Sequence, residues 1–259
     1  MLNQLMNIQF YEINSDMKIV DKRPILFLQE FNALIIADLH LGLEAIMQDD
    51  GSFVPHNLTN QIVETIRFYL ENLKPKKLIL NGDIKHSFQE PTKLENRDVK
   101  KFFKGISPYV PEIHVIKGNH DIFLSWAIKG FENIFVHTTG YTIGKYYITH
   151  GDKELETKLS EDIKYIIVGH LHPVFESRVN GLQKVRNPSF LLGPLKSMTQ
   201  KILVVPAFTE YSSGSPINPH LKNHHIIPLL RDHADLQDFE LFVLGEDEVF
   251  HFPKLRLWM

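Results

Sequence analysis

The chain has 259 residues, a formal net charge of -3 and no cysteine. A chain of this length forms one large domain or two small ones and buries enough surface to fold without disulfide cross-links. The absence of thiols excludes disulfides and thiolate zinc fingers, so any metal site must use nitrogen and oxygen ligands. The slight negative charge also argues against a general polyanion binder, although a bound metal can create a local positive site.

The sequence shows neither a membrane span nor a signal peptide. No stretch reaches the roughly 18 apolar residues that a span requires, and Met1 to Leu5 lacks the basic and apolar regions of a signal peptide. We therefore expect a cytoplasmic protein that does not contact a membrane. No internal repeat or low-complexity linker interrupts residues 1–259, which predicts a single domain.

The first part of the chain alternates between strand-like and helical patterns. Residues 24–28 and 33–37 flank a short polar turn and predict a β-hairpin. Apolar residues then recur at helical spacing over 58–73, and Lys74-Pro75 ends that helix. The apolar run 78–80 follows. Strand, helix and strand in succession predict a βαβ unit, which implies parallel strands and a right-handed crossover.

The rest of the chain is predicted to complete two sheets. Three runs at 135–137, 141–143 and 146–148 are predicted to be antiparallel strands of a second sheet. Asn180-Gly181 is the strongest hairpin signal in the chain, and the polar segment Pro206 to Pro219 is predicted to be a loop. The other predicted elements are helices over 94–105 and 122–128 and strands over 113–116, 165–168, 201–205, 239–243 and 249–252.

Five short polar motifs each follow an apolar, strand-like run. A single such motif is weak, because Gly-Asn after a strand is usually only a turn. In an extended chain residues i and i+2 share a face, so Asp38 and His40 can point at one ion, and His170 and His172 are expected to face the same way. The ordered set therefore predicts a functional site. Its motifs are Asp38-Leu39-His40, Gly82-Asp83, Gly118-Asn119-His120-Asp121, His150-Gly151 and Gly169-His170-Leu171-His172.

In type and order these motifs resemble those of the calcineurin-like metallophosphoesterases, and they span residues 38–172. That family has an α/β (α+β) fold, a four-layer αββα sandwich with two mixed β-sheets, which agrees with the predicted elements. Two flanking sequences resemble a small stand-alone group of the family that is related to DNA-repair nucleases. They are Asp38-Leu39-His40-Leu41-Gly42 and Gly82-Asp83-Ile84-Lys85-His86.

A pair of divalent ions needs a carboxylate that contacts both, and Asp83 is the natural bridge. The other ligands that the resemblance implies are Asp38, His40 and His172 for one ion and Asn119, His150 and His170 for the other. Imidazole, carboxylate and amide ligands suit transition metals better than calcium. The family commonly uses manganese or an iron–zinc pair. Manganese is therefore the expected cofactor, with iron, zinc, cobalt and nickel as alternatives.

The expected chemistry is the hydrolysis of a phosphate ester. The charge of two dications would exceed that of Asp38, Asp83 and a bridging hydroxide by about one unit, which attracts an anionic ester. Metals also lower the pKa of bound water toward about 7 and so provide a nucleophile at neutral pH. His120 is expected to protonate the leaving oxygen, with Asp121 orienting its imidazole. His86 is either an ordinary loop residue or part of the same rim.

The favoured function is therefore a two-metal phosphodiesterase or nuclease that acts through a metal-bridging hydroxide, with nucleic acid as the favoured substrate. The Pro206 to Pro219 loop is the candidate wall beside the site. One alternative is a small-molecule phosphatase or nucleotide phosphodiesterase. Another is a non-catalytic scaffold of the same fold, although the presence of His120 together with every ligand argues against it. The sequence leaves the oligomeric state open.

Overall fold

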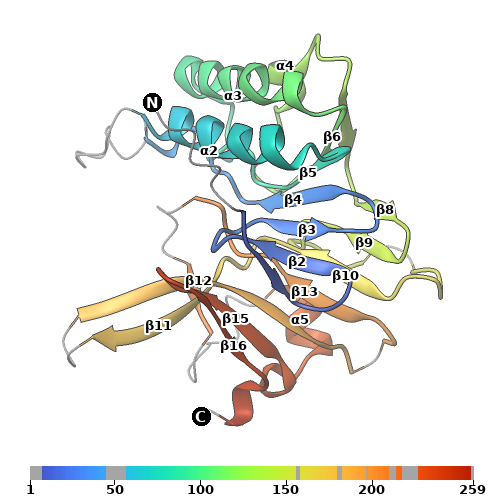
Figure 1. Cartoon of the computed structure of the whole chain (residues 1–259). Helices are drawn as coiled ribbons and strands as arrows, with labels where there is room; N and C mark the ends of the chain where they lie inside the picture. The colour runs from blue at the N-terminus through green and yellow to red at the C-terminus, as the bar shows by residue number, and fades with distance from the viewer. Residues whose placement is uncertain are drawn as a thin grey trace.

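Two β-sheets pack face to face, and helices lie on their outer sides (Figure 1). The computed structural model describes residues 8–44, 57–155, 158–179, 183–196, 198–209, 214–217 and 227–257. This is the predicted αββα sandwich with two mixed sheets. The helices α2 (Leu58–Leu73), α3 (Lys93–Ile106) and α4 (Ser125–Ile128) cover the first sheet, and α5 (Pro228–His233) covers the second.

Within the described residues, the first sheet has seven strands in the order β1-β2-β3-β4-β5-β6-β7. Strands β1 to β4 pair antiparallel, whereas β4 to β7 pair parallel. The predicted hairpin (β3 and β4) and the predicted βαβ unit (β4, α2 and β5) are both confirmed. The bounds are β1 (Phe10–Glu12), β2 (Met17–Val20), β3 (Leu26–Leu28), β4 (Ala33–Ala37), β5 (Lys77–Asn81), β6 (Glu112–Ile116) and β7 (Ile134–His137).

The second sheet has the order β14-β11-β12-β13-β10-β9-β8 in the described part of the chain, and β15 and β16 extend it from β12. Strands β9, β10 and β13 are parallel to one another, so their carboxyl ends lie at the same edge. The bounds are β8 (Tyr141–Ile143), β9 (Tyr146–Ile148), β10 (Tyr165–Val168), β11 (Pro173–Val179), β12 (Gln183–Pro194), β13 (Lys201–Val204), β14 (Ser215–Pro216), β15 (Glu240–Leu244) and β16 (Val249–Phe252).

One predicted strand belongs to the other sheet. The run 135–137 was expected in the second sheet, but it forms β7, which pairs in parallel with β6 from Ile113↔Ile134 onward. This strand lies at the edge of the first sheet, and none of its residues is fully buried. Its hydrophobic pattern therefore does not reveal its partner. The antiparallel pair that was predicted beside it, β8 and β9, is confirmed.

The helix ends show local sequence control. The side chain of Thr92 accepts a hydrogen bond from the Glu95 backbone N–H at 3.1 Å and caps α3. Helix α2 ends where Lys74 adopts a left-handed φ of 47°, directly before Pro75. Short 3-10 turns lie at η1 (Ser107–Tyr109), η3 (Leu236–Asp238) and η4 (Leu255–Leu257).

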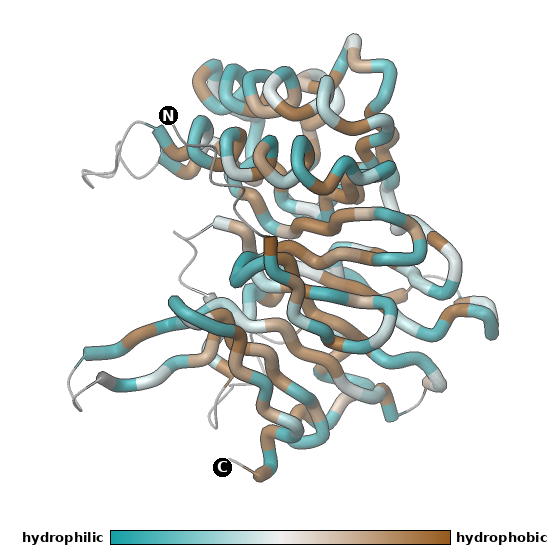
Figure 2. The backbone as a smooth tube through the Cα atoms, in the orientation of Figure 1, coloured by the Kyte–Doolittle hydropathy of each residue, from teal (hydrophilic) through white to brown (hydrophobic). Residues whose placement is uncertain are grey.

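Three hydrophobic layers hold the sandwich together, and Figure 2 shows the hydrophobic residues concentrated along the strands. One layer lies between the two sheets and includes Ile35, Tyr146 and Phe190. The other two lie between each sheet and its helices. Strand β4 is buried at all five positions because it is covered on both faces. Among the described helices, none is both long enough and apolar enough to cross a membrane.

One predicted turn and one predicted loop fall wholly or partly outside the described residues. Asn180-Gly181 lies outside them, although β11 and β12, which flank it, pair antiparallel as that turn requires. The Pro206 to Pro219 segment is described only at 206–209 and 214–217. There the Ser215 backbone N–H donates to the His172 carbonyl oxygen at 2.8 Å. The described part of this segment therefore runs beside one of the predicted metal ligands.

Candidate metal centre

The predicted site residues come from loops at the carboxyl ends of five strands. Asp38 and His40 follow β4, Asp83 follows β5, and Asn119 and His120 follow β6. Three more residues come from the second sheet: His150 follows β9, and His170 and His172 follow β10. The pairing of the parallel strands brings these loops together at one edge of the sandwich.

The loop backbone is unusual at five of the predicted ligands. These non-glycine residues adopt a left-handed φ, which is uncommon and costs free energy, and such residues cluster at functional sites. The prediction had assumed an extended chain around Asp38 and His40. Convergence instead arises from sharp left-handed turns. The residues are Asp38 (56°), His40 (47°), Asp83 (48°), His170 (64°) and His172 (49°).

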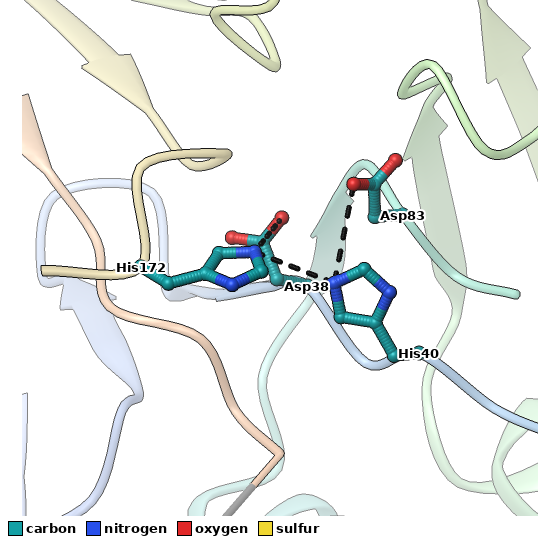
Figure 3. Close-up of side chains that lie close together, drawn as sticks. All are labelled: Asp38, His40, Asp83 and His172. Atoms are coloured by element: carbon teal, nitrogen blue, oxygen red, sulfur yellow. Dashed lines mark hydrogen bonds and ion pairs between the residues drawn. The ribbon is translucent and has the colours of Figure 1, made fainter. Parts of the chain in front are cut away.

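The first group of potential ligands contains Asp38, His40, Asp83 and His172, whose ligand atoms all lie within 4.8 Å of one another. Figure 3 shows these four side chains close together, with dashed contacts from His172 to Asp38 and His40 and from His40 to Asp83. The Nε2 atom of His172 lies 3.2 Å from Oδ1 of Asp38 and 3.3 Å from Nε2 of His40. The His40 Nε2 atom lies 4.0 Å from Oδ2 of Asp83.

The second group shares Asp83 with the first and adds His150 and His170. Nε2 of His150 lies 3.3 Å from Oδ2 of Asp83 and 3.0 Å from Nδ1 of His170. The other nitrogen of His150, Nδ1, lies 3.2 Å from the Asn81 carbonyl oxygen, which orients the ring. Asp83 is thus the carboxylate that both groups have in common.

The charge distribution fits a cation site. Burial opposes ionisation of Asp83, but the hydrogen bond and charge of His150 and the charges of His120 and His40 hold its pKa well below the usual range. Burial also opposes protonation of His150, yet Asp83 and Asp38 raise its pKa to about 9. For His40, burial prevails and lowers the pKa to about 3. The carboxylates are therefore charged and attract positive charge.

The donor set and one orphaned atom test whether metal ions fit here. Oδ1 of Asn119 is buried without a hydrogen-bond partner among the described residues, and a buried amide oxygen is costly unless something binds it. The adjacent Gly118 lies against Asp83 and His150: a Cβ placed on it would lie 2.2 Å from Asp83 Oδ1 and 2.9 Å from His150 Nε2. Imidazole nitrogens, carboxylate oxygens and this amide oxygen suit two transition-metal ions that share Asp83.

His120 lies beside the shared carboxylate. Its Nε2 atom is 3.7 Å from Oδ2 of Asp83, and its backbone N–H donates to Asp83 Oδ1 at 3.1 Å. Its Nδ1 atom contacts the carbonyl oxygen of His86, which assigns a proton to Nδ1. The half-exposed ring of Phe88 packs on the imidazole, with 3.6 Å between the ring centroids. This arrangement directs Nε2 toward the candidate metal centre.

The structure corrects the role predicted for Asp121. Its carboxylate was expected to orient the His120 imidazole, but the His86 carbonyl oxygen occupies that position. Asp121 instead accepts backbone N–H groups of Gly118 at 3.0 Å and Ile84 at 3.0 Å, and a longer one from Lys85 at 3.3 Å. It is fully buried, and burial raises its pKa to about 7. Asp121 therefore ties the loops after β5 and β6 together.

Two residues around the site carried no signal in the sequence analysis. Phe88 lies in an irregular loop without periodicity. Glu95 belongs to the amphipathic helix α3, yet its buried Oε1 accepts the backbone N–H groups of His86 at 3.0 Å and Ser87 at 2.8 Å. These bonds fix the loop that carries His86, whose Nδ1 lies 3.4 Å from Nδ1 of His40. His86 therefore lies at the rim.

Two solved structures were compared with the chain. The chain is similar to the nuclease MPE of Pseudomonas putida, with a TM-score of 0.63 and 18% identity over 95% of this chain and 100% of the nuclease. It also aligns with the phosphoesterase YfcE of E. coli, with a TM-score of 0.41 and 14% identity over 86% and 98% of the two chains. No curated protein matches it in sequence.

The family comparison covers half of the chain. The model of the calcineurin-like phosphoesterases matches residues 31–160, which include Asp38, Asp83, Asn119, His120 and His150. Members of this family depend on a binuclear metal centre, and the two ligand groups that share Asp83 provide positions for one. The chain belongs to the calcineurin-like phosphoesterase family.

Proposed function

We propose that the protein is a two-metal phosphodiesterase, with nucleic acid as its substrate class. The observation that carries this proposal is the position of His120. Its Nε2 atom lies 3.7 Å from the carboxylate that both ligand groups share, while its Nδ1 atom is held by a backbone carbonyl. A proton donor is thus held beside the place where the two ions would bind a phosphate.

The proposed ligands follow from the two groups. We assign manganese as the resident metal because the resembled family commonly uses it; the mixed nitrogen and oxygen donors also suit iron, zinc, cobalt or nickel. When bound, the two ions would neutralise phosphoryl charge and supply a nucleophilic water at neutral pH. The assigned ligands are Asp38, His40, Asp83 and His172 for the first ion and Asp83, Asn119, His150 and His170 for the second.

The chain's own residues then perform the proton transfer and the positioning. With Nδ1–H bound to the His86 carbonyl oxygen, His120 acts as the imidazolium. It gives the proton on Nε2 to the leaving oxygen, which makes expulsion of a poor leaving group possible, and is left as the neutral imidazole. The His86 carbonyl oxygen fixes the imidazole through Nδ1, and Phe88 covers one face of the ring. These contacts hold the proton donor in one orientation, so no reorientation is needed during the reaction.

The surroundings of His120 favour an ester with an alkoxide leaving group, and the motif flanks that resemble those of repair nucleases favour a diester among such esters. A general acid is needed most for an alkoxide leaving group, such as the sugar oxygen of a nucleic acid. The exposed face of Phe88 offers a nearby surface on which a sugar or base can pack. The similar fold of the P. putida nuclease supports this reading by showing that such a sandwich accommodates nuclease activity.

The proposal is tested with manganese-loaded wild type and His120→Ala on DNA, RNA, cyclic nucleotides, phosphomonoesters, and aryl and alkyl diesters. We expect diesters to be the best substrates. The variant should retain its metals and lose on the order of 10²–10⁴ in kcat for alkyl diesters, with a smaller loss for nitrophenyl diesters. His251→Ala, on the exposed part of β16, is the control.

Equal losses for good and poor leaving groups would contradict the assignment of His120. Faster hydrolysis of monoesters than of every diester would indicate a small-molecule phosphatase. The absence of both bound metal and hydrolysis would favour a non-catalytic scaffold.

A further inference from the structure

A cavity of about 430 Å³ adjoins the second ligand group. Gly118 and Asn119 form part of its wall, so it borders a proposed ligand of the second ion. The rest of the wall comes from segments that follow strands of both sheets. These segments contribute Lys117 after β6, Thr138 and Thr139 after β7, and Lys153 shortly after β9.

The lining of this cavity suits a phosphate group. Lys117 and Lys153 bring two ammonium groups, and Asp152 brings one carboxylate, which leaves a positive balance. Neither lysine has an ion-pair partner within the part of the chain that the structure describes. The exposed Thr138 and Thr139 add hydroxyl groups. Lysine binds phosphate as a compact charge, and hydroxyl groups complete the hydrogen bonding to its oxygens.

The cavity and the proton donor adjoin different ligand groups. The ring of His120 packs against His40 of the first group, with 5.1 Å between centroids, and against Phe88. The cavity instead adjoins Asn119 and the segment directly after His150 of the second group. For a diester held between the two groups, the leaving arm therefore extends toward His120. The arm that remains on the product phosphate extends toward the lysines.

We infer that this cavity is a subsite for a second phosphate, carried by the nucleoside that stays attached to the product. The inference rests on the proposed function and names its substrate class more closely: a phosphodiester chain with a further phosphate one nucleoside away from the scissile one. Lys117 and Lys153 are specificity-determining residues in this scheme, and the reacting atoms do not contact them.

Matched chromogenic substrates test the subsite. The first pair is thymidine 5′-(p-nitrophenyl phosphate) with and without a 3′-phosphate, and the second is thymidine 3′-(p-nitrophenyl phosphate) with and without a 5′-phosphate. Within each pair the leaving group and scissile bond are the same. We expect the added phosphate to raise kcat/KM by about tenfold in one pair, mainly through KM, because a charged hydrogen-bonded contact is gained.

The double variant Lys117→Gln/Lys153→Gln should lose this gain and leave kcat/KM for the substrates with one phosphate unchanged. Lys100→Gln/Lys101→Gln removes the same charge from the exposed side of α3 and should keep the gain. No gain in either pair, or a gain that survives in the cavity variant, would overturn the subsite.

A binding measurement separates this inference from the proposed function. Calorimetry should show that thymidine 3′,5′-bisphosphate binds the wild-type protein more tightly than thymidine monophosphates do, and that the cavity variant loses this preference. If no ester is hydrolysed but the preference is present and depends on the lysines, the proposed function fails and the subsite stands. Equal binding of bisphosphate and monophosphate would refute the subsite whatever the turnover.

Discussion

Asp83 is the residue on which both ligand groups depend. It belongs to each group, and its Oδ2 atom lies within 4.0 Å of His40 Nε2, His120 Nε2 and His150 Nε2. A terminal ligand such as His172 belongs to one group only. The loss of the shared carboxylate should therefore impair both sites, whereas the loss of a terminal ligand should impair one.

We predict that Asp83→Asn lowers the manganese content of the dialysed protein more than His172→Asn does. The amide of asparagine is neutral and cannot offer two anionic oxygens to two cations. Elemental analysis per chain measures the effect, and circular dichroism checks that both variants fold. Retention of the wild-type metal content by Asp83→Asn would refute the bridging role of Asp83.

Asp121 illustrates what residue patterns leave undetermined. Its position next to His120 suggested contact with the imidazole, but its carboxylate turns toward three backbone N–H groups. Sequence adjacency does not set the direction of a side chain, particularly in a turn. The sequence therefore placed Asp121 in the loop after β6, but it did not predict which groups its carboxylate binds.

We predict that Asp121→Asn lowers the free energy of unfolding by about 1–3 kcal/mol, because an amide nitrogen would face backbone donors that now bind a carboxylate oxygen. The dependence of the rate on the leaving group should stay as in the wild type, since His120 is oriented by the His86 carbonyl oxygen. Urea unfolding and a series of phenyl diesters measure the two effects. If the variant is as stable as the wild type but its rate depends differently on the leaving group, Asp121 would after all orient the His120 imidazole.

At the scale of elements, the site depends on the close approach of the loops after β5 and β6. A Cβ on Gly118 would lie 2.2 Å from Asp83 Oδ1 and 2.5 Å from the Asp83 backbone nitrogen. Backbone atoms cannot move aside as the end of a flexible side chain can. A side chain at this position would therefore force the two loops apart.

We predict that Gly118→Ala lowers both the metal content and the Tm. Gly130→Ala is the control, because nothing lies within 4 Å of a Cβ there. Its left-handed φ of 96° costs only local strain, so this control should lose some stability but keep its metals. Equal metal content in the two variants would show that the loops tolerate separation.

Most elements could be predicted because their patterns are local. Continuous apolar runs marked β4, β5, β6 and β10, and helical spacing marked α2 and α3. The sheet membership of β7 could not be predicted, because pairing at an edge depends on register with a neighbour rather than on the strand's own pattern. The left-handed turns at the ligands could not be predicted either. Aspartate and histidine adopt a positive φ in some loops but a negative φ in most, so these residue types alone do not indicate the turn.

At the scale of the whole molecule, protonation and metal binding compete. In the metal-free protein the folded pKa of His150 is about 9, above the ordinary 6.5. The stabilisation that protonated His150 gives to the folded protein is therefore complete below pH 6.5 and is lost as the pH rises toward 9. The folded pKa of His40 is about 3, below 6.5, so stability is also lost as the pH falls below 6.5. Taken together, these two histidines favour the folded, metal-free protein most strongly near pH 6.5.

We predict that manganese raises the Tm and that the increase grows between pH 6.5 and 9. The metal must displace the proton from His150, and it binds the folded state only. Thermal unfolding with excess manganese or with a chelator, at matched pH values, measures the difference. A Tm increase that stays constant or shrinks over this range would show that His150 does not exchange a proton for the metal.

The division of the ligands between the two sheets has a consequence for the synthesis of the protein. The contact between His40 and His172 joins residues 132 positions apart, and His150 and His170 also come from the second sheet. A nascent chain that has emerged only through β7 carries both aspartates of the site but none of these three later imidazoles. Such a chain should hold a metal ion only weakly until β10 and the two histidines that follow it have left the ribosome and docked. The shortest ribosome-bound chain that retains manganese tightly would therefore show the chain length at which the two sheets dock.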